Sequence, residues 1–182
     1  MNKTGSPNSK KIALAGILTA LAAAALFLEN IFPTGKLGFY ILASFILSVV
    51  IMECGLSFGW LSYAAVSVLA LLLVPEKTAV FPYILFFGIY SLVKSHIERL
   101  NKLIPEWVLK FLFFNLSLFF MWNIAVHLLG LIPQGLLNAL PVYAIVLILQ
   151  VAFFAFDWIF TFWTQYYLNK ISPKIHGTDT AL

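Results

Sequence analysis

Charged residues are scarce in this chain of 182 residues. They make up 10% of the sequence, with 11 Lys and Arg against 7 Asp and Glu, whereas a soluble protein carries about 25%. Hydrophobic residues make up 62%, and the mean hydropathy is +0.98. That is more apolar surface than one core of this size can bury. A soluble globular domain, a disordered chain and a free nucleic-acid-binding protein are therefore excluded, and lipid is the expected solvent.

Cysteine is nearly absent, because Cys54 is the only one. A disulfide scaffold is therefore excluded, and Cys/His metal-ligand spacing is missing. The phosphate-binding loop, the G-x-S-x-G nucleophile motif and the H-E-x-x-H zinc motif are also missing. We therefore predict a protein that is not an enzyme, with no catalytic residue, no metal and no cofactor.

Long apolar runs are what the sequence has in place of these features. A helix needs about 20 apolar residues to cross about 30 Å of hydrocarbon. Helices are expected because backbone groups unpaired in lipid are costly and no run alternates with period two. The sequence predicts an all-α polytopic membrane protein with six transmembrane helices, or five if the second and third runs merge. The runs cover 11–29, 37–53, 56–74, 78–97, 108–131 and 139–168.

Basic residues predict the orientation of these spans. With the N-terminus in the cytoplasm, nine Lys and Arg fall inside and only Lys36 and Lys77 fall outside, as the positive-inside rule requires. Both termini are therefore expected in the cytoplasm, and the protein in the cell membrane. Residues 1–10 are predicted as a disordered cytoplasmic tail, 11–168 as the membrane domain and 169–182 as a second cytoplasmic tail.

Polar side chains within the spans are costly unless they find partners. Asn115 and Asn123 share one stripe of the fifth span, and Gln150 and Asp157 share one stripe of the sixth. Because the two helices run antiparallel, Asn123 reaches the depth of Gln150, and Asn115 that of Asp157. Interhelical hydrogen bonds are one expected role of these polar groups, and contact with a substrate is the other for Asn123 and Gln150. For Asp157, either protonation or pairing with a basic residue of the inner boundary is expected.

A second polar group gathers at the predicted outer face. Glu29 closes the first span, Lys36 and Tyr40 follow a short loop, His127 ends the fifth span and Tyr143 opens the sixth. The mouth of a helical bundle with aromatic walls and a few convergent polar groups is typical of a small-molecule site. A ligand taken from outside is therefore expected here. The alternative is that Glu29 and Lys36 lie among lipid headgroups.

Small residues recur every four positions in the first span, at Gly16, Ala20 and Ala24. This spacing places them on one helical face, where another helix can approach closely. The face serves either a tight contact within the bundle or the docking of a separate membrane subunit. The charged stretch 94–106 is predicted as a cytoplasmic loop with an amphipathic helix that lies along the inner leaflet or against a partner.

The layout resembles the substrate-binding S component of energy-coupling-factor (ECF) vitamin transporters. The features that carry this resemblance are Lys10-Lys11 before a small-residue helix, the Pro/Gly loop 31–38 and the glycine-spaced turn 54–62. The resemblance implies that Gly16, Ala20 and Ala24 contact a membrane coupling subunit, which cytosolic ATPases drive. It further implies substrate contacts at Lys36, Tyr83, Asn123, His127 and Tyr143. No signature assigns a particular vitamin.

Two other functions fit the same sequence. The first is a non-transporting membrane scaffold of the cell-shape-determining type, which would have no ligand at the outer mouth. The second is an intramembrane lipid-handling enzyme, with Glu53, His96, Glu98 and Asp157 as candidate acid/base groups at the inner boundary.

Overall fold

The computed structural model describes residues 7–32, 35–100, 102–128, 130 and 141–177, and over these residues it contains helices and no strand. The predicted all-α membrane fold is confirmed, since six of the described helices are long and apolar enough to cross a membrane. The chain divides into two compact units, Met1–Met121 and Trp122–Leu182. The six candidate spans are Ser9–Ile31, Lys36–Cys54, Leu56–Leu73, Lys77–Leu100, Leu103–His127 and Val142–Lys174.

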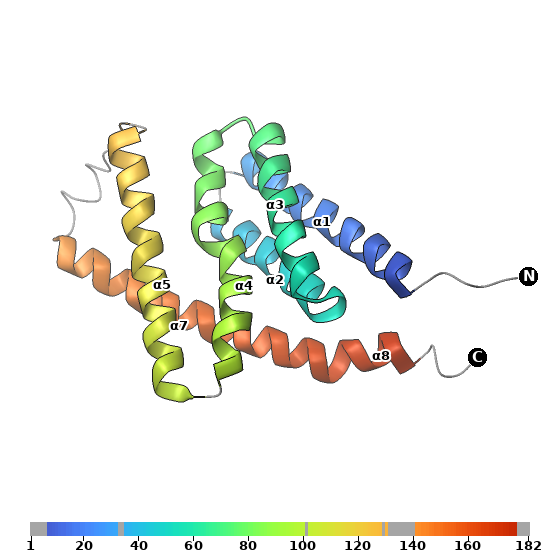
Figure 1. Ribbon diagram of the computed structural model, residues 1–182. Helices are drawn as coiled ribbons and strands as arrows, with labels where there is room; N and C mark the ends of the chain where they lie inside the picture. Colours follow the sequence, from blue (N-terminus) through green and yellow to red (C-terminus); the bar gives the residue numbers. More distant parts are fainter. Residues whose placement is uncertain (1–6, 33–34, 101, 129, 131–140, 178–182) are drawn as a thin grey trace, which may run out of the picture. The chain divides into compact units, whose positions relative to one another are not determined.

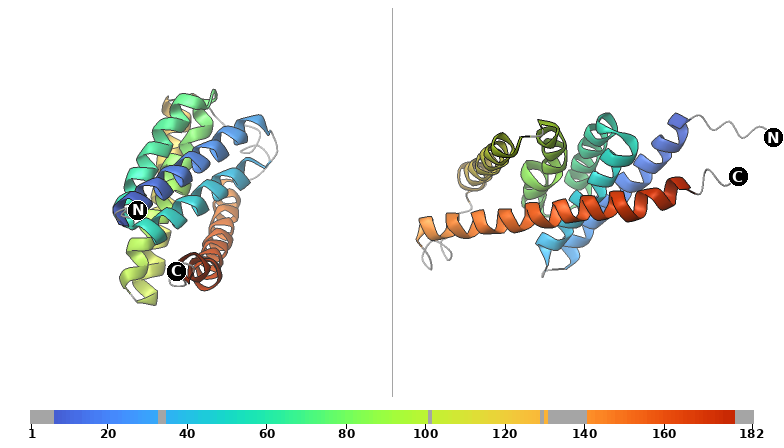
Figure 2. Two further views of the ribbon diagram at one scale, coloured as in Figure 1. Left: turned by 90° about the vertical axis from the view of Figure 1, so that its right-hand side faces the viewer. Right: turned by 90° about the horizontal axis from the view of Figure 1, so that it is seen from below.

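Two helical hairpins form the body of the first unit (Figures 1 and 2). α1 (Pro7–Ile31) pairs with α2 (Lys36–Cys54), and α3 (Leu56–Leu73) pairs with the fourth span, which includes α4 (Gly88–Ile97). α1 also packs on α3, and α2 on α4. α1 begins at Pro7. Residues 7–10, which the sequence predicts as part of a disordered tail, are therefore helical.

Small side chains let the hairpins pack closely. The buried cluster at their centre combines alanines with larger residues from all four helical segments. Alanine permits close approach of two helix backbones, which is the main source of attraction between helices in lipid. The cluster contains Ala22, Ala25, Leu26, Tyr40, Ala43, Ile46, Val66, Ala70, Val74, Val80 and Tyr83.

Gly55 separates the second and third spans. Its φ of 97° lies in a region that side chains with a Cβ disfavour, and its N–H donates to the Ile51 carbonyl at 3.0 Å. One residue therefore ends α2 and starts α3, so the structure has two spans where a merged run was the alternative.

The fourth span is not a uniform α-helix. It runs through a 3-10 turn (Lys77–Val80), a π-helical turn (Tyr83–Phe87), α4 and a second 3-10 turn (Glu98–Leu100). Hydroxyl groups of neighbouring helices donate to carbonyls at the π turn: Tyr63 to Ile84 O at 2.7 Å, and Ser44 to Phe87 O at 2.6 Å. These hydrogen bonds stabilise the π turn, because lipid offers no donors to its carbonyl groups.

α5 (Leu103–Asn123) packs on the fourth span through aromatic rings. The ring of Phe86 lies 6.2 Å from that of Phe113 and 5.4 Å from that of Phe114, measured between centroids. Tyr90 adds a further ring contact with Phe113, at 6.1 Å. Offset and edge contacts of this kind stabilise a helix pair beyond their buried area.

The second unit contains one long helical run. It comprises α7 (Val142–Tyr166), a π turn (Tyr167–Ile171) and α8 (Ser172–Gly177). The hydroxyl of Thr161 donates to Asp157 O and that of Thr164 to Phe160 O, at 2.8 and 2.9 Å, so the helix satisfies its own threonines. Residues 169–177, expected in a tail, are helical. Residues 178–182, like 1–6 and the predicted span ends at 131 and 139, lie outside the described residues.

Candidate functional site

Charged side chains meet where α1 ends, α2 begins and α3 has just ended. Lys36 Nζ lies 3.3 Å from Glu29 Oε1 and 3.3 Å from Glu76 Oε2. Lys36 is the first residue of α2, directly after Gly35, whose φ is 93°. The tight turn between α1 and α2 therefore returns Lys36 to the end of α1. We call Glu29, Lys36, Tyr40 and Glu76 the Glu29 cluster.

Burial differs sharply within the Glu29 cluster. The Glu29 side chain is 1% exposed, whereas Lys36 is 41% and Glu76 is 55% exposed. A desolvated carboxylate is costly unless it is paired and hydrogen-bonded. Glu29 is therefore the member of the cluster that most needs a partner of opposite charge. Lys36, which is partly exposed, pairs with it from the surface.

The Glu29 carboxylate has acceptor capacity left over. Its Oε1 atom is buried, lies at ion-pair distance from Lys36 and accepts no hydrogen bond from any residue that the structure describes. Tyr40 neighbours Glu29, but its hydroxyl donates its one proton to Ala79 O at 2.6 Å. An ionised carboxylate offers about four lone-pair sites, so Glu29 can accept further donors.

Glu76 lies outside the membrane-spanning segments, at the surface of the Glu29 cluster. The Thr78 hydroxyl donates to Glu76 Oε1 at 3.0 Å, and Lys36 approaches Oε2. The Thr78 hydrogen bond, followed by the Lys36 hydrogen bond and charge, holds the pKa of Glu76 below its ordinary value. Glu76 therefore stays ionised and keeps hold of Lys36. Sequence reasoning left Glu76 out of the site, because 40 residues separate it from Lys36.

Tyr83 is fully buried on the π turn of the fourth span. Its hydroxyl has no hydrogen-bond partner within the described part of the chain. The π geometry places its ring against Gly88, where an added Cβ would lie 2.8 Å from Tyr83 Cζ. Gly88 thus makes room for the ring. Tyr83 joins the buried cluster that also contains Tyr40, and an unsatisfied buried hydroxyl calls for an explanation.

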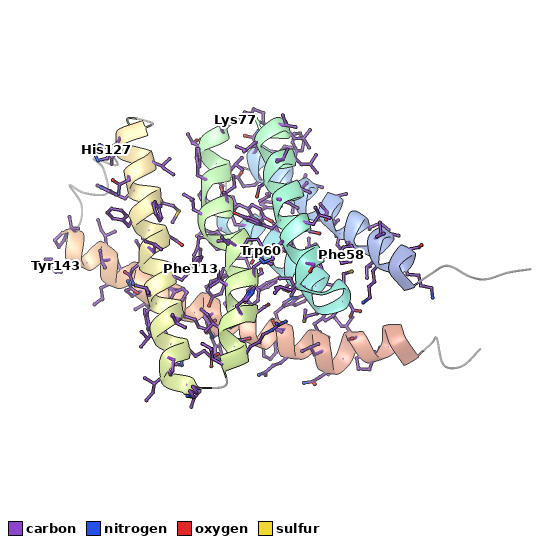
Figure 3. The ribbon with its side chains drawn as sticks, viewed as in Figure 1. Phe58, Trp60, Lys77, Phe113, His127 and Tyr143 are labelled. Atoms are coloured by element: carbon purple, nitrogen blue, oxygen red, sulfur yellow. The ribbon has the colours of Figure 1, made fainter. Side chains whose placement is uncertain are left out.

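The other four predicted substrate contacts belong to the second unit (Figure 3). Tyr143 is the second residue of α7 and is 78% exposed. His127, on the π turn Ile124–Leu128, is exposed, whereas Asn123 and Gln150 are half-buried. A pocket that they share with the Glu29 cluster stays a prediction.

The two predicted buried polar groups differ. Asn115 is exposed, and its side-chain amide donates to Phe111 O, one turn earlier in the same helix, at 2.8 Å. A bond of this kind ties the amide to its own helix, a local arrangement that the depth of a residue along the helix does not predict. Asp157 is buried.

The small residues of α1 form an uncovered face. Gly16, Ala20 and Ala24 are all exposed, and a Cβ added to Gly16 would meet no atom within 4 Å. Gly16 and Ala20 line an apolar groove of about 530 Å³ between α1 and α3, to which Phe58 of α3 contributes (Figure 3). At the groove the Thr19 hydroxyl donates to Ala15 O at 2.6 Å, and its oxygen lies 2.9 Å from Ser62 Oγ.

Four charged side chains gather at the opposite end of the first unit. Lys94 Nζ lies 2.8 Å from Glu98 Oε1, and Lys110 Nζ lies 3.4 Å from the same oxygen and 3.5 Å from Glu106 Oε1. Both lysines are buried. Lys94 lies within α4, and the described part of 94–106 forms the helix ends on either side of a short connection. The single amphipathic helix predicted over this stretch is therefore replaced by the end of α4, a 3-10 turn and the start of α5, while contact with the inner leaflet or a partner stays a prediction.

Two of the four groups proposed for acid/base chemistry, His96 and Glu98, have contacts that the structure describes. Glu98 accepts both lysines, and a ring nitrogen of His96 lies 3.0 Å from Leu92 O, in its own helix. Among the described residues, no three His, Cys, Asp or Glu side chains are grouped so that they could hold a metal ion. Comparison with known proteins gives no relative: no family model, curated protein or solved structure matches the chain.

Proposed function

We propose that this protein is the membrane-embedded substrate-binding component of an ECF-type importer. It takes a vitamin or other small organic nutrient from outside at the Glu29 cluster. A membrane coupling subunit, driven by cytosolic ATPases, docks on α1 and allows release of the nutrient inside. The chain supplies binding and no chemistry.

The uncovered face of α1 is the observation that carries this proposal. Gly16 and Ala20 border a groove of about 530 Å³, and Ala24 continues the exposed stripe one turn further. Lipid chains adapt to any helix surface, so contact with lipid does not require small side chains. Small side chains do allow the backbone of another helix to approach closely. A second membrane protein is the partner that such a face suits.

The Glu29 cluster supports the capture of a ligand at one end of the bundle. A buried carboxylate with unused acceptor capacity and a buried tyrosine hydroxyl without a partner within the described part of the chain are unusual, because native proteins satisfy most such groups. Both lie in the first unit, and a polar ligand would supply the missing donors and acceptors.

Co-purification from native membranes tests the proposal. Wild-type protein should retain a membrane subunit and two ATPases, identified by mass spectrometry, together with a small molecule that is released on denaturation. Ala20→Leu and Ala24→Leu should lose the subunits and keep the small molecule, because each leucine fills the face without touching the Glu29 cluster.

Ala64→Leu is the matched control, since Ala64 is exposed on α3 and does not line the groove. It should retain the subunits. Retention of the subunits by Ala20→Leu and Ala24→Leu alike would contradict docking through α1. A preparation that carries neither subunits nor small molecule would instead favour the scaffold function.

A further inference from the structure

One carboxylate oxygen of Glu29, Oε1, accepts no hydrogen bond from the described residues, and this limits the chemistry of the ligand. The Oε1 atom is buried, and an ionised carboxylate can only accept. A ligand group that satisfies it must bring a positive charge or an N–H donor. A ligand carboxylate would meet repulsion from Glu29 and from Glu76, which its surroundings keep ionised.

Lys36 shows what kind of group fits beside Glu29. Its ammonium lies 3.3 Å from Glu29 Oε1 and 3.3 Å from Glu76 Oε2. Because Lys36 is 41% exposed and already held by Glu76, it can leave Glu29 without losing its only counter-ion. The nearby Lys77 does not compete for Glu29, because its ammonium donates to the Leu71 and Val74 carbonyls.

An N–H-donating cation suits this carboxylate better than sodium does. Glu29 Oε1 is buried and accepts no hydrogen bond from the described residues, and an ammonium can balance its charge and donate a hydrogen bond to it at the same time. Sodium brings no N–H donor.

We infer that Glu29 binds a protonated amine or similar N–H-donating cation of the ligand, and that Lys36 occupies this position when no ligand is bound. The inference rests on the proposed function, since it names the chemical class of the nutrient. Binding exchanges one ammonium for another on Glu29, while Lys36 keeps its ion pair with Glu76.

Chemical rescue tests this without knowledge of the nutrient. Lys36→Ala leaves Glu29 buried without its counter-ion, so its thermal unfolding midpoint in detergent micelles should fall below that of the wild type. Ethylammonium chloride should recover most of the loss, and sodium chloride at the same ionic strength should not. Lys36→Gln is measured in parallel and should show the same rescue.

Two controls locate the effect at Glu29. The double variant Glu29→Gln/Lys36→Ala has no carboxylate to satisfy, so ethylammonium should leave its midpoint unchanged. Lys77→Ala removes a lysine from the same end of the bundle but uncovers no carboxylate, so it should also gain nothing. Equal rescue by sodium chloride, or rescue of the double variant, would overturn the inference.

Recovery of folded protein is part of the measurement. Each variant is purified with and without ethylammonium, and a Lys36 variant that folds only with it counts as rescued. If neither Lys36 variant folds in either condition while the double variant does, the inference is overturned. The coupling subunit takes no part in this experiment, so a failed rescue leaves the proposed transport function to its own test.

Discussion

At the scale of single residues, Tyr63 and Tyr83 make an informative pair. Their rings pack together with centroids 6.4 Å apart. The Tyr63 hydroxyl donates to Ile84 O at 2.7 Å, whereas the Tyr83 hydroxyl has no partner within the part of the chain that the structure describes. Removing the Tyr63 hydroxyl therefore breaks a hydrogen bond, whereas removing the Tyr83 hydroxyl breaks none among the described residues. Comparing the two variants measures the difference.

Tyr63→Phe should lower the free energy of unfolding by about 1 kcal/mol, and more if Ile84 O is left unsatisfied. Tyr83→Phe should be neutral or should raise it by up to about 1–3 kcal/mol, because it removes a buried group that pays desolvation without a hydrogen bond. Denaturant unfolding in micelles measures both. The reverse order would show that Tyr83 has a partner. If Tyr83 contacts the nutrient, Tyr83→Phe should also weaken nutrient binding.

The pH dependence of stability should report on Glu76. Its pKa is lowered in the folded protein by the Thr78 hydrogen bond and by Lys36, so folding favours the ionised form. This stability is present above the ordinary carboxyl pKa and is lost as the pH falls through the lowered value. Between about pH 5 and about pH 3, the unfolding midpoint should thus fall further in wild type than in Glu76→Gln. The difference should be small, because Glu76 is 55% exposed, and identical slopes would contradict it.

What sequence reasoning found at this scale depended on distance along the chain. Glu29 lies near the end of α1, and Lys36 and Tyr40 lie near the start of α2. Their proximity therefore follows from the short loop between the two helices. Glu76 reaches the same place only through the packing of α3. The burial of Lys94 was also missed, because hydropathy treats a lysine as exposed whether or not a glutamate such as Glu98 neutralises it.

At the scale of helices, two glycines with different surroundings test the packing. Gly59, at the start of α3, faces Ile51 and Leu92, and a Cβ there would lie 2.5 Å from Ile51 Cγ1. Gly16 of α1 has open space in that position. The same substitution should therefore have opposite effects at the two sites.

Gly59→Ala should reduce the free energy of unfolding by about 1–3 kcal/mol, because the methyl group forces α3 away from its neighbours. Gly16→Ala should be neutral or stabilising by up to about 1 kcal/mol, since alanine is the better helix former. Thermal unfolding of both variants in one detergent measures this. A larger loss for Gly16→Ala would mean that the α1 face is covered in the isolated protein.

The positions of the helices were predictable because the apolar runs that mark membrane spans can be recognised from hydropathy and run length alone. Five of the six predicted runs start within about five residues of the observed spans, while 139 lies outside the described residues. The local form of the fourth span was not predictable. Its π turn depends on hydroxyls from Tyr63 and Ser44, which come from other helices and leave no period in the sequence. The exposure of Asn115 was not predictable for a related reason, because its amide donates to a carbonyl of its own helix, and the depth of a residue along the helix does not reveal such a bond.

At the scale of the whole molecule, the difference in charge between the two ends of the first unit predicts which end faces the cytoplasm. In the described part of the first unit, the Glu29 end has Lys36 and Lys77 against two glutamates, Glu29 and Glu76. The opposite end has six Lys and Arg against three Glu. The latter are Lys10, Lys11, Lys94, Arg99, Lys102 and Lys110, with Glu53, Glu98 and Glu106.

Cysteine labelling should therefore show the Glu29 end outside the cell. Lys77→Cys and Lys102→Cys each replace an exposed lysine, one at each end, in a Cys54→Ser background that removes the single native thiol. A membrane-impermeant maleimide should label Lys77→Cys in intact cells and Lys102→Cys only after permeabilisation, because basic loops stay in the cytoplasm. Labelling in the reverse order would place the Glu29 cluster inside the cell. Capture of a nutrient from outside would then fail as a function, whereas the rescue of the Lys36 variants by ethylammonium would still test whether Glu29 accepts an ammonium group.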